Sequence, residues 1–132
     1  MGGFSFDAGF PDIRNNFYGF ETDPLMPNRV WVFAQFEGTN TGPLPFGGEP
    51  TGRRVVTCPQ MTSLVFDDEG KVVRYNIGYP LDRTTGNSGG LGGVYGILYG
   101  LGRALPFPEA QPWTPSKRYR LFQWIARATG RG

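Results

Sequence analysis

The feature that most constrains the fold is a pair of alternating stretches on either side of the turn Asp67-Asp68-Glu69-Gly70. Alternation of apolar and polar residues is typical of a half-buried β-strand. A glycine at the end of the turn suits the positive φ of a tight hairpin. We therefore predict that residues 53–66 and 71–82 pair as an antiparallel hairpin that turns at Asp68–Gly70. Because Pro59 cannot donate a ladder hydrogen bond, we expect a bulge or bend there.

A second strand is predicted for residues 29–38, because the side chains of this run alternate between two faces. One face is apolar, and the other becomes polar toward the end of the run; the two sets are Val30, Val32, Ala34 and Phe36, and Trp31, Phe33, Gln35 and Glu37. Residues 14–22 are predicted to form a first strand, with a proline-based turn at 23–28. Residues 39–52 are predicted to form a long loop.

Glycine and proline dominate the rest of the chain, with 21 and 12 of the 132 residues. The aromatic content of 15% argues against disorder, so we expect long ordered connections. After residue 86 Gly92, Gly96 and Gly100 recur at every fourth position. On a helix they would form a smooth stripe for close contact with another backbone or a flat ring. An irregular glycine-rich loop is the alternative, and both remain open.

The end of the chain is predicted to be a basic amphipathic helix over residues 116–129, capped by Thr114, with Pro115 at its first position and Gly130 at its end. We expect its apolar residues to contact apolar neighbours; they are Leu121, Phe122, Ile125 and Ala128. The opposite face holds Lys117, Arg120, Trp124, Arg127 and Arg131. Residues 113–132 contain no acid. This face suits anionic lipid or an acidic partner, and a solvated face with a packed tryptophan is the alternative. One short basic helix is too small a footprint to predict nucleic-acid binding.

The residues that the chain lacks exclude several kinds of chemistry. The sequence has no histidine, which removes imidazole ligands and the commonest general base. Its one cysteine, Cys58, allows no internal disulfide or thiolate cluster and is expected to be a small buried side chain. We predict no metal or cofactor. No run approaches the roughly 20 apolar residues of a membrane-spanning helix.

Four motifs occur in an order that resembles the SnoaL-like family of the nuclear transport factor 2-like superfamily. They are Phe36–Leu44, Pro50–Val56, Leu64–Tyr75 and, at the end of the last strand, Asp82. The resemblance covers about residues 10–82. It implies an α+β fold in which a curved antiparallel sheet forms a cone around N-terminal helices, with a pocket between them.

Only nine residues precede Phe10, so those helices are expected to be missing. A bare sheet would expose Trp31, Phe33, Phe36 and Phe66, and would need cover from the C-terminal half of the chain or from a partner. We expect residues 1–85 to form the sheet and residues 86–132 a docking extension of the same unit. The sequence of residues 86–124 resembles plastid-associated proteins of algae and plants, which implies a plastid location.

The resemblance implies that Asp82 is a general acid/base, as in SnoaL-like cyclases. The alternative is a structural carboxylate that pairs with Arg83 or caps the next turn. Candidate pocket residues are Trp31, Phe33, Tyr75 and Tyr79. For the two tyrosines the alternative is ordinary cross-strand packing.

Three functions compete. We favour a non-catalytic accessory subunit docked on a larger assembly at a plastid photosynthetic membrane. The alternatives are a carrier of a small hydrophobic ligand in the cone and an isomerase or cyclase that uses Asp82. The predicted docking residues are Gly92, Gly96, Gly100, Arg120, Trp124 and Arg127.

Overall fold

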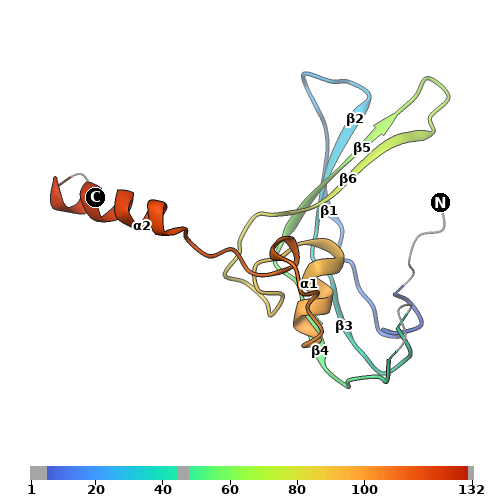
Figure 1. Cartoon of the computed structure of the whole chain (residues 1–132). Coiled ribbons are helices and arrows are strands. Elements are labelled where there is room, and N and C mark those ends of the chain that lie inside the picture. Colours follow the sequence, from blue (N-terminus) through green and yellow to red (C-terminus); the bar gives the residue numbers. More distant parts are fainter. Residues whose placement is uncertain (1–5, 45–47, 131–132) are drawn as a thin grey trace.

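The computed structural model describes residues 6–44 and 48–130, and it shows an α+β fold with antiparallel strands and a C-terminal helix (Figure 1). The predicted fold class is therefore confirmed. The elements are β1 (Tyr18–Thr22), β2 (Arg29–Ala34), β3 (Glu37–Thr39), β4 (Arg54–Val56), β5 (Gln60–Phe66), β6 (Val72–Pro80), α1 (Gly93–Gly100), the 3-10 helix η1 (Pro108–Ala110) and α2 (Lys117–Ala128). One sheet has the order β1-β2-β5-β6, and β3 and β4 form a two-stranded sheet.

The hairpin of β5 and β6 forms as the alternation predicts, with Leu64 opposite Tyr75. Asp67 organises the turn, because its Oδ1 accepts hydrogen bonds from the N–H groups of Glu69 and Lys71, both at 2.9 Å. Gly70 has a φ of 79°, the positive value for which glycine is favoured.

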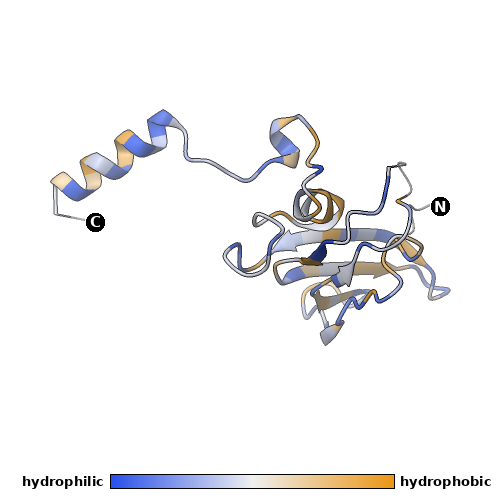
Figure 2. Cartoon of the chain, turned by 90° about the horizontal axis from the view of Figure 1, so that it is seen from below, coloured by the Kyte–Doolittle hydropathy of each residue, from blue (hydrophilic) through white to orange (hydrophobic). Residues whose placement is uncertain are grey.

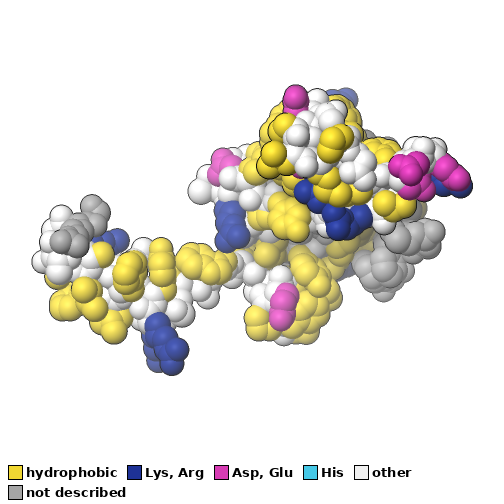
Figure 3. Space-filling view, turned by 90° about the horizontal axis from the view of Figure 1, so that it is seen from above, with side chains coloured by type: hydrophobic (Ala, Val, Ile, Leu, Met, Phe, Trp, Pro, Cys, Tyr) yellow, Lys and Arg dark blue, Asp and Glu magenta, His cyan; other side chains and the backbone are white. Residues whose placement is uncertain are grey.

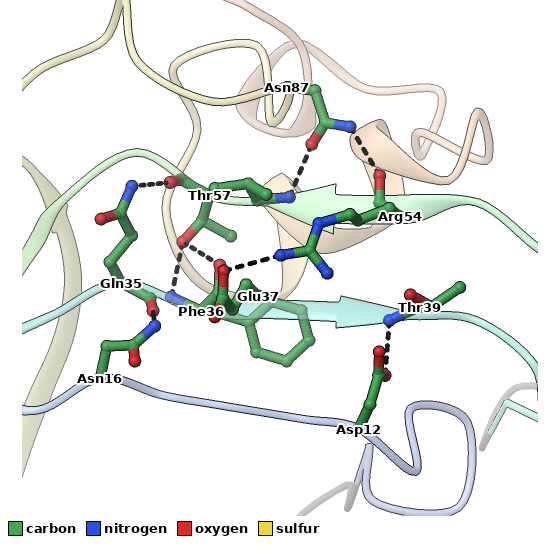
Figure 4. Close-up of polar contacts among 10 residues, drawn as sticks. Asp12, Asn16, Gln35, Phe36, Glu37, Thr39, Arg54, Thr57 and Asn87 are labelled. Carbon is green, nitrogen blue, oxygen red and sulfur yellow. Dashed lines mark hydrogen bonds and ion pairs between the residues drawn. The ribbon is translucent and has the colours of Figure 1, made fainter.

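The two long predicted strands are each interrupted at the same level of the molecule. The run 29–38 is not one strand, because it divides into β2 and β3 at Gln35 and Phe36. The run 53–66 divides into β4 and β5 around Pro59, as predicted. At this level the Thr57 hydroxyl accepts a hydrogen bond from the N–H of Phe36 at 3.0 Å, and the Thr57 N–H donates to the Phe36 carbonyl at 2.9 Å (Figure 4). This pairing keeps the two chain segments hydrogen-bonded across the break between the strands, and the Phe36 side chain is buried in the core.

The hydrophobic core lies at the β3–β4 end of the molecule, where α1 packs. Its members are Phe10, Phe36, Leu44, Val55, Ile97 and Leu101. The N-terminal lead-in contributes Phe10, which meets Phe36 edge to face at 5.2 Å. Within the described residues 6–17 no helix occurs, and of the predicted strand 14–22 the structure confirms Tyr18–Thr22 and an isolated bridge of Arg14 to Glu37.

The glycine-rich segment forms the helix α1, so of the two alternatives the helix is observed. The side-chain oxygen of Gln60 accepts a hydrogen bond at 2.9 Å from the N–H of Gly93, which fastens the start of the helix to β5. A Cβ atom on Gly92 would lie only 1.8 Å from the carbonyl oxygen of Gly78 in β6. A Cβ on Gly100 would lie 2.9 Å from Val55 in β4. These glycines therefore let α1 approach the chain's own strands.

The C-terminal helix α2 begins at Lys117, close to the predicted start, but its cap differs from the prediction. Ser116 is the cap, with an Oγ that accepts a hydrogen bond from the N–H of Tyr119 at 3.1 Å, so the predicted cap at Thr114 is wrong. Pro115 precedes the cap. Gly130, with a φ of 71°, follows the helix end as predicted. α2 projects away from the body on an extended linker (Figure 1). It has no buried residue, so the expected packing of its apolar face does not occur within the described chain.

None of the helices in the described residues is both long enough and apolar enough to cross a membrane.

Candidate functional site

Asp82 follows β6 and closes a local turn. Its Oδ1 accepts hydrogen bonds from the hydroxyl and N–H of Thr84 at 2.6 and 3.0 Å, and its Oδ2 accepts from the hydroxyl of Thr85 at 2.6 Å. These bonds, first those from the two hydroxyls, lower the pKa of Asp82 to about 2. A general acid needs a raised pKa to hold a proton near neutral pH. The structure therefore places Asp82 in the turn-capping alternative rather than in an apolar pocket.

Cys58 lies between β4 and β5 in the sequence and contacts Ser88 and Leu91, in the segment that leads into α1. Its side chain is buried, and burial raises the pKa of its thiol above the ordinary value. Its Sγ lies 3.5 Å from the carbonyl oxygen of Leu91, to which the thiol donates. A buried thiol of raised pKa is a poor nucleophile.

The four-stranded sheet has two faces of different character. Directly opposite residues of an antiparallel pair share a face, so the register arranges each face in rows across the strands. The helix-side face is the one that α1 adjoins, and it includes Val30, Val32, Thr62, Leu64, Tyr75 and Ile77. The far face has the rows Arg29–Val65–Arg74, Trp31–Ser63–Asn76 and Phe33–Met61–Tyr79.

A hollow of about 420 Å³ lies on the far face. Its lining residues are Arg29, Trp31, Met61, Ser63, Arg74, Asn76, Tyr79 and Leu81. The rows make it cationic at one end and apolar at the other. A neighbouring hollow of about 460 Å³ shares Trp31 and Met61 and adds Phe33, whose ring stacks on Tyr18 at 5.2 Å. This arrangement suits a small organic anion with an apolar body.

The cationic end is held by contacts around Asp23. The Asp23 carboxylate accepts a hydrogen bond from the indole N–H of Trp31 at 2.9 Å and lies 3.7 Å from Nη1 of Arg29. The hydrogen bonds from the N–H of Leu25 and from Trp31 lower the pKa of Asp23. The Arg29 guanidinium lies over the Trp31 ring at 5.2 Å, and its Nε is buried without a hydrogen-bond partner in the described part of the chain.

The predicted pocket residues do not gather at one site. Trp31, Phe33 and Tyr79 share the far face, whereas Tyr75 lies on the helix-side face. The reason is a bulge in β6. Met61 pairs with Tyr79 while Ser63 pairs with Asn76, so a step of two residues along β5 matches a step of three along β6. The extra residue reverses the alternation between the two tyrosines.

The helix-side face is only partly covered. α1 adjoins it at one end, where Ile97 shares a small hollow with residues of the sheet and of the lead-in. Phe17, Tyr75 and Ile77 line the same hollow, yet they are exposed to 53, 48 and 52%. These three are called the uncovered patch below. Figure 3, which shows the molecule from above, has hydrophobic side chains over much of the body's visible surface.

The predicted docking residues fall into two groups. Gly92, Gly96 and Gly100 belong to α1 and its start, against the chain's own backbone and strands. The others, Arg120, Trp124 and Arg127, lie on α2, where all three are exposed (Figure 2 shows the helix apart from the body).

Residue patterns alone missed Arg29, Arg74 and Asn76. The only available signal is register, because Arg29 and Arg74 both pair with Val65 from opposite sides. Register depends on turn and bulge geometry, which the alternation does not reveal.

No family model matches the sequence, and no curated protein matches it. Among solved structures the chain is similar to the crystal structure of AclR, a proposed hydroxylase from Streptomyces galilaeus, with 22% sequence identity and a TM-score of 0.49. The match covers 94% of this chain and 62% of the other, so this chain spans less than two thirds of that structure. Similarity at this level says nothing about activity.

Proposed function

We propose that this chain is a non-catalytic interaction subunit whose uncovered patch binds an apolar surface of another protein in a larger assembly. The observation that carries the proposal is the exposure of Phe17, Tyr75 and Ile77, each about half open to water, beside a face that α1 covers only at one end. Contiguous exposed apolar side chains on a soluble domain mark interaction surfaces.

The energetics favour cover by a partner. Removing apolar surface from water contributes roughly 25 cal/mol per Å², and aromatic side chains contribute large areas at interfaces. The patch lies on β6 and before β1, which are the two edge strands of the sheet. An edge strand also offers unpaired backbone groups to a partner. A protein that packs on the patch would therefore gain both apolar burial and access to backbone hydrogen bonds.

The chemistry of the site candidates supports a non-catalytic role. The carboxylate that the resemblance nominates, Asp82, holds two threonine hydroxyls and has a lowered pKa. Cys58 is buried with a raised pKa. Neither is prepared to exchange protons or attack a substrate at neutral pH.

The resemblance to the SnoaL-like family gives the proposal its form. In that family helices cover the concave side of the sheet, and in this proposal a partner protein covers the uncovered patch. The resemblance of residues 86–124 to plastid-associated proteins extends the proposal to a plastid photosynthetic assembly.

Site-specific photo-crosslinking tests the proposed interface. A photoreactive phenylalanine analogue at position 77 should give protein adducts in the cells that make this chain. The same analogue at Asn76, the adjacent residue on the opposite face of β6, is the matched control and should give far fewer. Equal adducts from both positions, or none from position 77, would contradict the proposed interface.

A second candidate function, the carrier, is favoured by the far-face hollow with its two arginines and Trp31. Anilinonaphthalene sulfonate, an aromatic anion, is a suitable probe. If the hollow is the site, Arg74→Gln should weaken binding of the probe severalfold, whereas Ile77→Ser on the helix-side face should leave it unchanged. The reverse pattern would assign the probe to the uncovered patch and remove the support for a carrier.

A further inference from the structure

We propose that α2 binds the surface of an anionic membrane and anchors the chain there. The helix has no buried residue, and its apolar side chains Leu121, Phe122 and Ile125 are exposed to 58, 66 and 47%. An amphipathic helix with cations on its polar face and only a moderate share of apolar residues is typical of a helix that lies in the membrane interface.

The spacing of residues along α2 divides it into two faces, with Arg118 at the N-terminal end of the apolar face, four residues before Phe122 and seven before Ile125. A long arginine side chain can extend from such a position to the polar headgroups. Leu121 and Ile125 are four residues apart and share one face. Arg120 and Arg127 are seven apart and lie toward the other. Trp124 stands three residues after Leu121 and four after Arg120, which places it at the boundary between the faces. Tryptophan is enriched at this depth because its ring is apolar and its N–H is polar.

The charge of α2 complements anionic lipid. Its cations are Lys117, Arg118, Arg120 and Arg127, and it contains no acidic residue. Within the described part of the chain none of the four forms an ion pair. Residues 1–112, by contrast, hold 8 basic and 11 acidic residues, a net charge of −3. An anionic surface therefore attracts the helix and repels the body.

The linker separates α2 from the body (Figure 1). η1 ends at Ala110, and the side chain of Gln111 holds the chain by donating to the carbonyl of Leu105 at 2.5 Å. Pro112 and Pro115 restrict the backbone that follows. Trp113 is exposed, and its ring contacts that of Tyr119 edge to face at 5.8 Å, so a second tryptophan lies on the linker next to α2. Figure 1 and Figure 2 both show α2 clear of the body.

Vesicle sedimentation of the full chain tests the charge requirement. Vesicles that combine phosphatidylcholine with phosphatidylglycerol should bind the chain, vesicles of phosphatidylcholine alone should bind it far less, and added salt should weaken binding. Each Lys or Arg near an anionic surface contributes roughly fivefold. The double variant Arg120→Gln, Arg127→Gln should therefore bind about thirtyfold more weakly. The control Arg14→Gln, Lys71→Gln removes equal charge from the body, at residues outside the far-face hollow, and should not weaken binding.

A second pair of variants tests the apolar face. Phe122→Ser removes an exposed ring from this face, and loss of its burial in lipid should reduce binding at least about tenfold. Gln123→Ser, on the next residue but on the polar side, should leave binding within roughly twofold. In a Trp31→Phe background the remaining tryptophans are Trp113 on the linker and Trp124 on α2. A blue shift of their fluorescence on addition of vesicles therefore reports insertion of this part of the chain.

The outcomes are decisive for the anchor. Failure to bind phosphatidylglycerol vesicles at low salt, equal binding to both kinds of vesicle, or equal binding by Phe122→Ser and Gln123→Ser would each overturn it. None of these results bears on cross-linking from position 77. The protein interface and the membrane anchor are therefore tested independently.

Discussion

Replacing the buried Asn40 by alanine should destabilise this chain far more than the same replacement of an exposed asparagine. Asn40 is fully buried, with 0% of its surface exposed. Its Nδ2 donates to the carbonyls of Gly9 and Gly42, both at 3.0 Å. Its Oδ1 accepts from the N–H and hydroxyl of Thr51 at 2.8 and 3.0 Å. The side chain thus ties the N-terminal lead-in and both ends of the long loop together.

The size of the effect follows from these four bonds. Asn40→Ala removes all four bonds: the Gly42 carbonyl and the N–H and hydroxyl of Thr51 lose these partners, and the Gly9 carbonyl keeps only its bond from the Gly42 N–H. At about 1 kcal/mol for each lost bond, the free energy of unfolding should fall by roughly 3–4 kcal/mol. Urea unfolding followed by circular dichroism measures this loss. The control is Asn28→Ala, which loses one exposed bond to the Phe66 carbonyl and should cost below about 1 kcal/mol. Equal losses for the two variants would refute the reasoning.

Three further predictions concern α1, Asp82 and Cys58. Gly92 has a φ of −98°, which alanine can also adopt, so the effect of Gly92→Ala comes from the clash of its Cβ with the Gly78 carbonyl. The free energy of unfolding, measured in urea, should fall by about 1–3 kcal/mol. An unchanged free energy of unfolding would contradict the close contact. Because the folded-state pKa of Asp82 is lowered from 3.8 to about 2, its stabilising contribution is present above pH 3.8 and lost as the pH falls toward 2. The free energy of unfolding of Asp82→Asn should therefore vary less with pH in that window, while any activity found should change only a few-fold; an unchanged acid slope would assign the turn no role. Cys58 should react with a thiol reagent only at the rate of unfolding, and fast labelling of the folded chain would contradict its burial.

The hairpin could be predicted from sequence because its causes are local. Alternation assigns the faces of β5 and β6, and the side chain of Asp67 forms the turn with residues two and four positions later. The break between β2 and β3 could not be predicted, because its cause is a distant residue. Thr57 takes the backbone of Phe36 out of the regular ladder, and no pattern within residues 29–38 reveals this partner.

In the candidate pocket a single bulge makes the prediction of which sheet face each tyrosine occupies wrong. Tyr75 and Tyr79 are four residues apart, and in a regular strand even spacing keeps both on one face. Gly78, with a φ of 82°, belongs to the segment where β6 carries its extra residue, and Tyr79 moves to the far face. Gly78 is also the residue against which Gly92 packs. The same short segment therefore aims Tyr79 into the hollow and receives the start of α1.

The two proposed surfaces can be used at the same time. The uncovered patch belongs to the sheet, whereas α2 stands on a linker that begins after η1. If α2 lies on an anionic surface, repulsion between that surface and the net-negative body keeps the body in water. The uncovered patch then remains accessible to a protein partner. Periodicity predicts which residues of α2 share a face. Only the charge contrast between helix and body indicates what that face contacts, and this contrast is the reason that we propose a membrane anchor beside a protein interface.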